Sequence, residues 1–146
     1  MKRWPSILLA LVLAAIAMAG CTAARNGLGT HASSCFRVLP AAQAAAGTSA
    51  RFDGVRLLPG DALIRTVSDV AKGRPGLPEH LQEVSHQATC LVAFRGTFSL
   101  SSVSRGWSPA PGPYPNAIVV MRQSSGDLVA TVLLRRLPRA IGFFHR

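Results

Sequence analysis

Four side chains able to bind a metal ion fall within eight residues of this chain, namely Glu79, His80, Glu83 and His86. On a helix, residues three apart share a face, so His80 and Glu83 would lie together while His86 would drift away from His80. The spacing matches no known zinc pattern such as His-Glu-x-x-His. We therefore favour a solvent-exposed helix face and predict no metal site. A hydrolase or metal-dependent enzyme that uses these residues is the alternative.

No other segment has the spacing of a known catalytic motif. A serine nucleophile needs a base and an orienting group within hydrogen-bond reach. The chain has no Gly-x-Ser-x-Gly, and Ser68 and Lys72 are one residue too far apart for Ser-x-x-Lys. With six acidic residues in the whole chain, paired-carboxylate hydrolysis has few candidates. These observations predict a non-catalytic protein that has no catalytic residues and needs no cofactor.

The first residues have the form of an export signal. Lys2 and Arg3 precede 13 apolar residues at positions 7–19, and Gly20 and Cys21 follow that run. A helix that crosses the hydrocarbon core of a bilayer needs about 20 apolar residues, so the run is too short to span it. A charged start, a short apolar segment and small residues before a processing site are typical of a secretory signal peptide.

The end of this segment, Met-Ala-Gly-Cys at positions 18–21, resembles the lipobox of bacterial lipoproteins, with Met18 in place of the usual leucine. In that class the cysteine sulfur receives a diacylglyceryl group and the chain is cleaved just before the cysteine. The resemblance covers residues 1–21 only. It implies a signal peptide over residues 1–20, lipidation of Cys21, and a membrane-anchored protein on the exported face of the cell envelope. An ordinary cleaved signal or a short uncleaved anchor is the alternative.

Two cysteines, Cys35 and Cys90, remain in the rest of the chain. In the oxidising setting of an exported protein, an even pair predicts a disulfide. A closed loop of this length could stabilise the fold by about 4 kcal/mol in the chain-entropy model. Residues 21–34 are small, polar and glycine-bearing, which predicts a flexible tether. Residues 35–146 then form one small domain.

The chain is strongly basic, with a formal net charge of +10 that falls by two, to +8, if Lys2 and Arg3 are removed with the leader. Outside a bacterial membrane, a positive surface would meet anionic lipid, envelope polymers or envelope proteins. We expect no nucleic-acid partner for an exported, lipid-tethered chain. Apart from Lys72 the cations of residues 21–146 are arginines, and a compositional bias of the genome explains this preference as well as a phosphate-binding role does.

The candidate binding surface combines arginines near the C-terminus with aromatic side chains, because such pairs are typical of contacts with membrane surfaces and other partners. Its members are Arg135, Arg136, Arg139, Phe143, Phe144, Trp107 and Tyr114. Two alternatives stay open: the C-terminal aromatic residues could complete the core, and the proline-rich loop at residues 104–115 could fold over the sheet and bury both of its rings.

Hydrophobic periodicity predicts an α+β domain in which two short helices pack on one face of a mostly antiparallel sheet of about four strands, in the order α-β-α-β-β-β. In the strand at residues 89–101, the period of two places apolar side chains on one face and polar side chains on the other, which predicts one buried and one solvated face. The apolar set is Cys90, Val92, Phe94, Phe98 and Leu100, and the polar set is Thr89, Arg95, Thr97, Ser99 and Ser101. The expected helices cover residues 39–46 and 61–72, with a helical turn at 78–86, and the expected strands cover residues 50–58, 89–101, 117–122 and 128–137.

The sequence therefore predicts a membrane-anchored envelope lipoprotein with a non-catalytic, basic binding or structural domain. An envelope hydrolase or metal-dependent enzyme is one alternative. An assembly lipoprotein that docks through its aromatic side chains onto a larger envelope complex is the other.

Overall fold

The computed structural model describes residues 33–71 and 78–139. The predictions for the signal peptide, for lipidation of Cys21, for the tether before Ser33, and for Phe143 and Phe144 lie outside these residues.

The centre of the described chain is a five-stranded sheet with the order β1-β2-β4-β5-β3. Neighbouring strands are antiparallel, except that β3 pairs with β5 in parallel. The strands are β1 (Arg51–Pro59), β2 (Ala88–Phe98), β3 (Gly106–Trp107), β4 (Tyr114–Arg122) and β5 (Leu128–Leu134). This sheet and the helices around it confirm the predicted α+β class. Four strands match the expected ones, and the two-residue β3 is an addition from the proline-rich loop.

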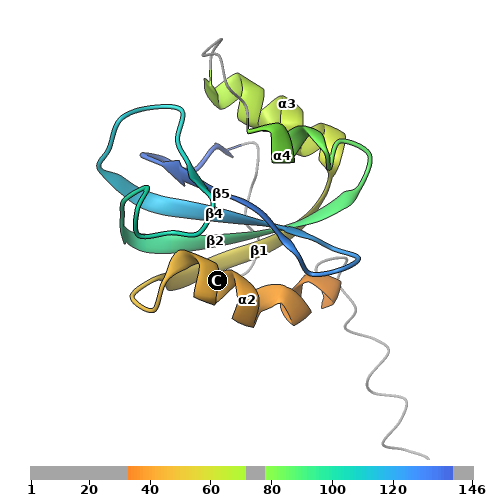
Figure 1. Cartoon of the computed structure of the whole chain (residues 1–146), viewed down its shortest axis with the longest axis horizontal. Helices are drawn as coiled ribbons and strands as arrows, with labels where there is room; N and C mark the ends of the chain where they lie inside the picture. The colour runs from red at the N-terminus through yellow and green to blue at the C-terminus, as the bar shows by residue number, and fades with distance from the viewer. Residues whose placement is uncertain (1–32, 72–77, 140–146) are drawn as a thin grey trace, which may run out of the picture. The chain divides into compact units, whose positions relative to one another are not determined.

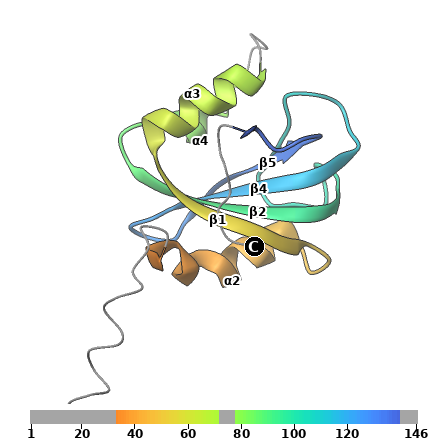
Figure 2. The same cartoon turned by 180° about the vertical axis from the view of Figure 1, so that it is seen from behind.

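Helices cover both faces of the sheet. A 3-10 helix, η2 (Ser33–Val38), leads directly into α2 (Leu39–Ala46), and this pair packs against one face. The other face is covered by α3 (Gly60–Ala71) and α4 (Glu79–Gln82). Figures 1 and 2 show α2 on one side of the strands and α3 with α4 on the other. The prediction that the helices share one face is therefore wrong.

The composition of the central strands explains this arrangement. In β2, Cys90, Val92 and Phe94 face α2, as the alternating pattern predicted, but Leu91 packs in the cluster beneath α3 and α4. Ala93 on the same strand is also fully buried. A strand with consecutive apolar residues must be covered on both faces, as in sheets with helices on either side. The predicted solvated face of β2 is therefore wrong.

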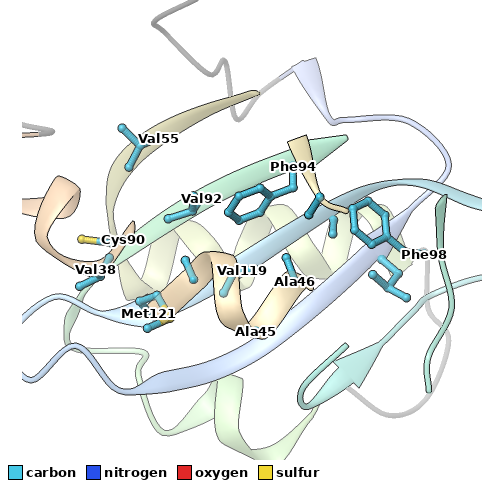
Figure 3. Packing of buried hydrophobic residues seen from close by; sticks show 14 of the residues in the cluster. Val38, Ala45, Ala46, Val55, Cys90, Val92, Phe94, Phe98, Val119 and Met121 are labelled. Atoms are coloured by element: carbon cyan, nitrogen blue, oxygen red, sulfur yellow. The ribbon is translucent and has the colours of Figure 1, made fainter. Parts of the chain in front are cut away.

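The cluster beneath α2 is built from small helix residues and larger strand residues. Ala42, Ala45 and Ala46 let α2 approach the sheet closely, where they meet side chains of β2 and β4 such as Phe94 and Met121 (Figure 3). The cluster beneath α3 follows the predicted helical stripe, with Leu63 and Val67 buried against the sheet.

The two helical layers are tied to the sheet at specific points. Cys35 in η2 and Cys90 in β2 form a disulfide, which confirms the predicted pairing, and their Cα atoms are 5.4 Å apart. On the other face, the amide of Gly60 donates a hydrogen bond to the carbonyl oxygen of Gln87 at 2.8 Å. A Cβ at Gly60 would lie 1.7 Å from the carbonyl oxygen of Val84, so glycine is required where α3 starts against the chain that follows α4.

Both edges of the sheet are irregular. The register of β1 against β2 shifts between Phe52 and Gly54, and a glycine is typical of a β-bulge. At the other edge, β3 pairs with β5 through Gly106 and Trp107 alone.

We predict that replacing both Cys35 and Cys90 by alanine lowers the free energy of unfolding by about 2 to 4 kcal/mol, because the bond closes a loop with a sequence separation of 55 residues. Urea unfolding of the double variant, and of the unmodified chain with and without a reductant, measures this loss. If the unfolding midpoint stays the same in all three, the disulfide does not stabilise the domain.

Candidate functional site

The candidate binding surface lies where β5 ends beside the loop that precedes β4. Arg135 is exposed, but its guanidinium faces this loop: Nη2 lies 2.9 Å from the carbonyl oxygen of Pro111 and 3.3 Å from that of Gly112, and Nε lies 3.2 Å from the oxygen of Pro111. Asn116 donates to the carbonyl oxygen of Arg135 at 3.2 Å. Arg135 is thus a residue that holds the loop in place, in addition to carrying charge.

The two aromatic rings of the loop are packed against the body of the domain. Tyr114 is 8% exposed and belongs to the cluster beneath α2, and its hydroxyl donates to the carbonyl oxygen of Ala110 at 2.8 Å. Trp107 is half-buried against the cluster beneath α3. These contacts support the alternative in which the proline-rich loop folds over the sheet and packs its aromatic rings against it. The ring of Tyr114 is therefore not available to a binding partner.

Arg136 and Arg139 are exposed and carry the free charge of this surface. Neither makes an ion pair or a hydrogen bond with any residue of the described ranges 33–71 and 78–139. Arg136 borders a hollow of about 350 Å³ between the C-terminal end of α3, the loop and the end of β5. Val70, Pro109 and Leu134 give this hollow apolar walls. An anionic group with apolar neighbours would find complementary chemistry here.

The charge of the chain is unevenly distributed along the sequence. Residues 84–146 contain seven arginines and one acid, Asp127. Asp127 lies in the hairpin at the opposite end of β5 from Arg136. Elsewhere, Arg65 pairs with Asp61 (Nη2 to Oδ2, 2.9 Å) and Arg95 pairs with Asp53 (Nε to Oδ1, 3.0 Å). The arginines after β5 thus lie in a segment that contains no aspartate or glutamate.

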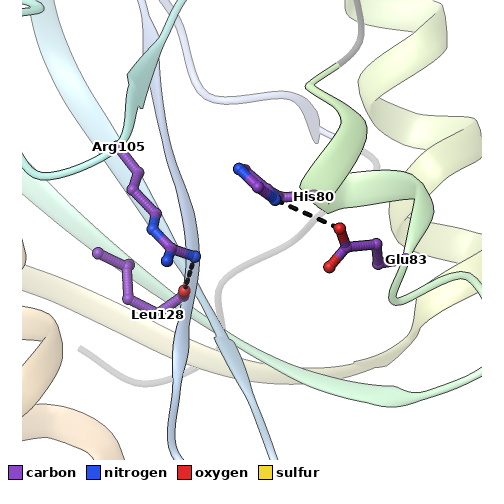
Figure 4. A network of polar contacts seen from close by, with 4 residues as sticks. All are labelled: His80, Glu83, Arg105 and Leu128. Atoms are coloured by element: carbon purple, nitrogen blue, oxygen red, sulfur yellow. Dashed lines mark hydrogen bonds and ion pairs between the residues drawn. The ribbon is translucent and has the colours of Figure 1, made fainter.

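The four metal-ligand candidates do not come together. His80 in α4 and Glu83, the residue that caps the C-terminal end of this helix, are neighbours, with 3.4 Å between Nδ1 and Oε1, as the helical spacing predicted (Figure 4). His86 instead borders a different hollow, beside Gly60 and Asp61. Within residues 33–71 and 78–139, no three histidine, cysteine, aspartate or glutamate side chains are arranged to hold a metal ion.

The His80–Glu83 pair borders a second hollow, of about 360 Å³, which the sequence analysis did not anticipate. Its other polar walls are Arg105, Arg122 and Asp127. These three residues come from the turn before β3, the end of β4 and the hairpin, and no motif links such distant positions. The apolar sequences of the neighbouring strands do not indicate that the ends of these strands lie close to α4. The sequence therefore could not predict that these three residues share a hollow with His80 and Glu83.

Comparison of the chain with protein-family models, with curated proteins and with solved structures finds no match. In the part of the chain that the structure describes, no helix is both long enough and apolar enough to cross a membrane.

We predict that Arg135→Lys lowers the melting temperature, because lysine keeps the charge but cannot reproduce three hydrogen bonds to two loop carbonyls. The expected loss of stability is about 1 kcal/mol. Arg136→Lys is the matched control and should melt as the unmodified chain does. Equal melting temperatures for both variants, measured by circular dichroism, would show that the Arg135 contacts do not stabilise the loop.

Proposed function

We propose that this protein is an exported, lipid-anchored envelope protein whose basic domain binds an anionic partner without catalysing a reaction. The observation that carries the binding role is the pair of exposed arginines, Arg136 and Arg139, in a segment without acidic residues. Arginine pairs bidentately with phosphate and carboxylate groups, so anionic lipid headgroups and acidic envelope polymers are the chemistry that fits.

The anchor in this proposal is Cys21, which the lipobox-like sequence places directly after the apolar segment. Two or more acyl chains hold a protein stably on a bilayer, because each buried CH₂ contributes about 0.8 kcal/mol. The predicted disulfide supports an oxidising compartment, since such bonds persist in exported proteins and are rare in the cytosol.

The anchor is tested by intact-mass measurement of the protein extracted from membranes of a bacterial host. We expect a mass that lacks residues 1–20 and includes a diacylglyceryl group, and we expect Cys21→Ser to release the protein from the membrane fraction. A retained leader, or an unmodified Cys21 on a membrane-bound chain, would refute lipidation. A control variant, Thr22→Ser, leaves the cysteine in place and should behave as the unmodified protein.

The binding role is tested with the lipid-free chain of residues 22–146 and vesicles of phosphatidylglycerol and phosphatidylcholine. Each arginine near an anionic surface contributes about 1 kcal/mol, so changing both Arg136 and Arg139 to glutamine should weaken binding roughly 30-fold. The double variant Arg37→Gln, Arg51→Gln removes the same charge elsewhere and should lose less.

Salt provides the second measurement for this prediction. Binding should disappear at about 0.5 M salt, where the Debye length is only about 4 Å. Binding that persists at this ionic strength, or equal losses in the two double variants, would contradict a localised electrostatic contact.

A further inference from the structure

The hollow between α4 and the hairpin end of the sheet gathers charged side chains from four separate segments. His80 comes from α4 and Glu83 directly follows that helix, Arg105 comes from the turn before β3, Arg122 from the end of β4, and Asp127 from the hairpin. At about 360 Å³ it falls within the lower part of the range for small-molecule sites. The site lies at the opposite end of β5 from Arg136, so it is independent of the function proposed above.

The guanidinium of Arg105 is held in a fixed position. Its Nη1 donates a hydrogen bond to the carbonyl oxygen of Leu128 at 2.8 Å, and its own carbonyl oxygen accepts one from the amide of Thr131 at 3.0 Å. Its φ is +49°, a left-handed conformation that residues other than glycine rarely adopt and that concentrates at functional sites. Figure 4 shows this guanidinium and the ring of His80 extending from opposite sides of the same region.

Arg122 lines the same hollow. Its Nε is buried and has no hydrogen-bond partner in the structure. Its backbone is fixed by the hairpin, where the amide of Arg122 donates to the oxygen of Asp127 and the amide of Gly126 donates to the oxygen of Arg122, both at 2.8 Å. Arg122 therefore adds a second arginine to the lining of the hollow, on a backbone that the hairpin holds in place.

Neither acid of the hollow is paired with an arginine of residues 33–71 and 78–139. Glu83 contacts His80, and Asp127 accepts a hydrogen bond from the hydroxyl of Ser125 at 2.6 Å. Two guanidinium groups and two carboxylates therefore line one small space, and their formal charges cancel when His80 is neutral. A ligand that also carries one positive and one negative group matches such a site better than a simple anion does.

We propose that this hollow binds a small zwitterion that carries a carboxylate and an ammonium group, as a free amino acid or a short peptide does. The carboxylate contacts the guanidinium groups of Arg105 and Arg122, and the ammonium group contacts Glu83 and Asp127. Val129, which belongs to the cluster beneath α3 and α4, supplies an apolar wall beside them.

The test is a titration of the full chain, labelled with ¹⁵N and held in non-ionic detergent, with glycylglycine. We expect saturable shifts of the amide resonances of Leu128 and Thr131, which lie beside Arg105. N-acetylglycylglycine lacks the ammonium group and glycylglycinamide lacks the carboxylate, so each should bind at least about tenfold more weakly. Equal binding of the acetylated peptide would overturn the zwitterion in favour of a simple anion.

Two variants separate loss of binding from loss of fold. Arg105→Asn removes the guanidinium but tolerates a positive φ, so it should fold and bind glycylglycine at least about tenfold more weakly. Arg122→Gln should weaken binding to a similar extent, whereas Arg51→Gln, at the opposite end of the sheet, should leave it unchanged. Unaltered affinity in folded Arg105→Asn, or no saturable shift with glycylglycine, would refute the site.

The chemistry of the negative group is tested with glycerophosphoethanolamine, which carries an ammonium group beside a phosphodiester. Weaker binding than that of glycylglycine supports a carboxylate ligand. Tighter binding would overturn this assignment and indicate a phospholipid headgroup.

Discussion

The structure depends on a sheet whose central strands are apolar on both faces. Leu91 and Val92 are neighbours in β2, yet they face opposite helical layers, and Val119 and Val120 repeat this arrangement in β4. Each face must therefore be removed from water, and one layer of helices cannot do so. This requirement explains why α2 and α3 lie on opposite sides although only β1 separates them along the chain.

The same requirement confines the polar chemistry of the domain to the two ends of the sheet. At the end where β5 finishes, Arg136 and Arg139 are exposed without acidic neighbours in their segment. At the hairpin end, Arg105 and Arg122 share a hollow with carboxylates. We therefore propose different ligands for the two ends: an extended anionic surface for the first and a small molecule of balanced charge for the second.

Local patterns in the sequence predicted the helices and strands well, because helical periodicity and turn residues act over short distances along the chain. The disulfide was predictable because it is one covalent bond between two cysteines. The α2 helix and the Cys35–Cys90 disulfide are examples. The side of the sheet on which each helix packs was predicted wrongly, since alternation in β2 was given more weight than its consecutive apolar residues. The Arg105–Arg122 hollow could not be predicted, because only the register of β4 and β5 and the position of α4 bring its walls together.

The irregular edges of the sheet affect how copies of the protein behave when they are crowded together. An open strand edge is a template onto which another chain can add, and this is a route to aggregation. Here the bulge at Gly54 distorts the β1 edge, while β3 covers part of β5 on the opposite side. Copies of the domain held side by side at high local concentration would thus resist polymerising through their strands.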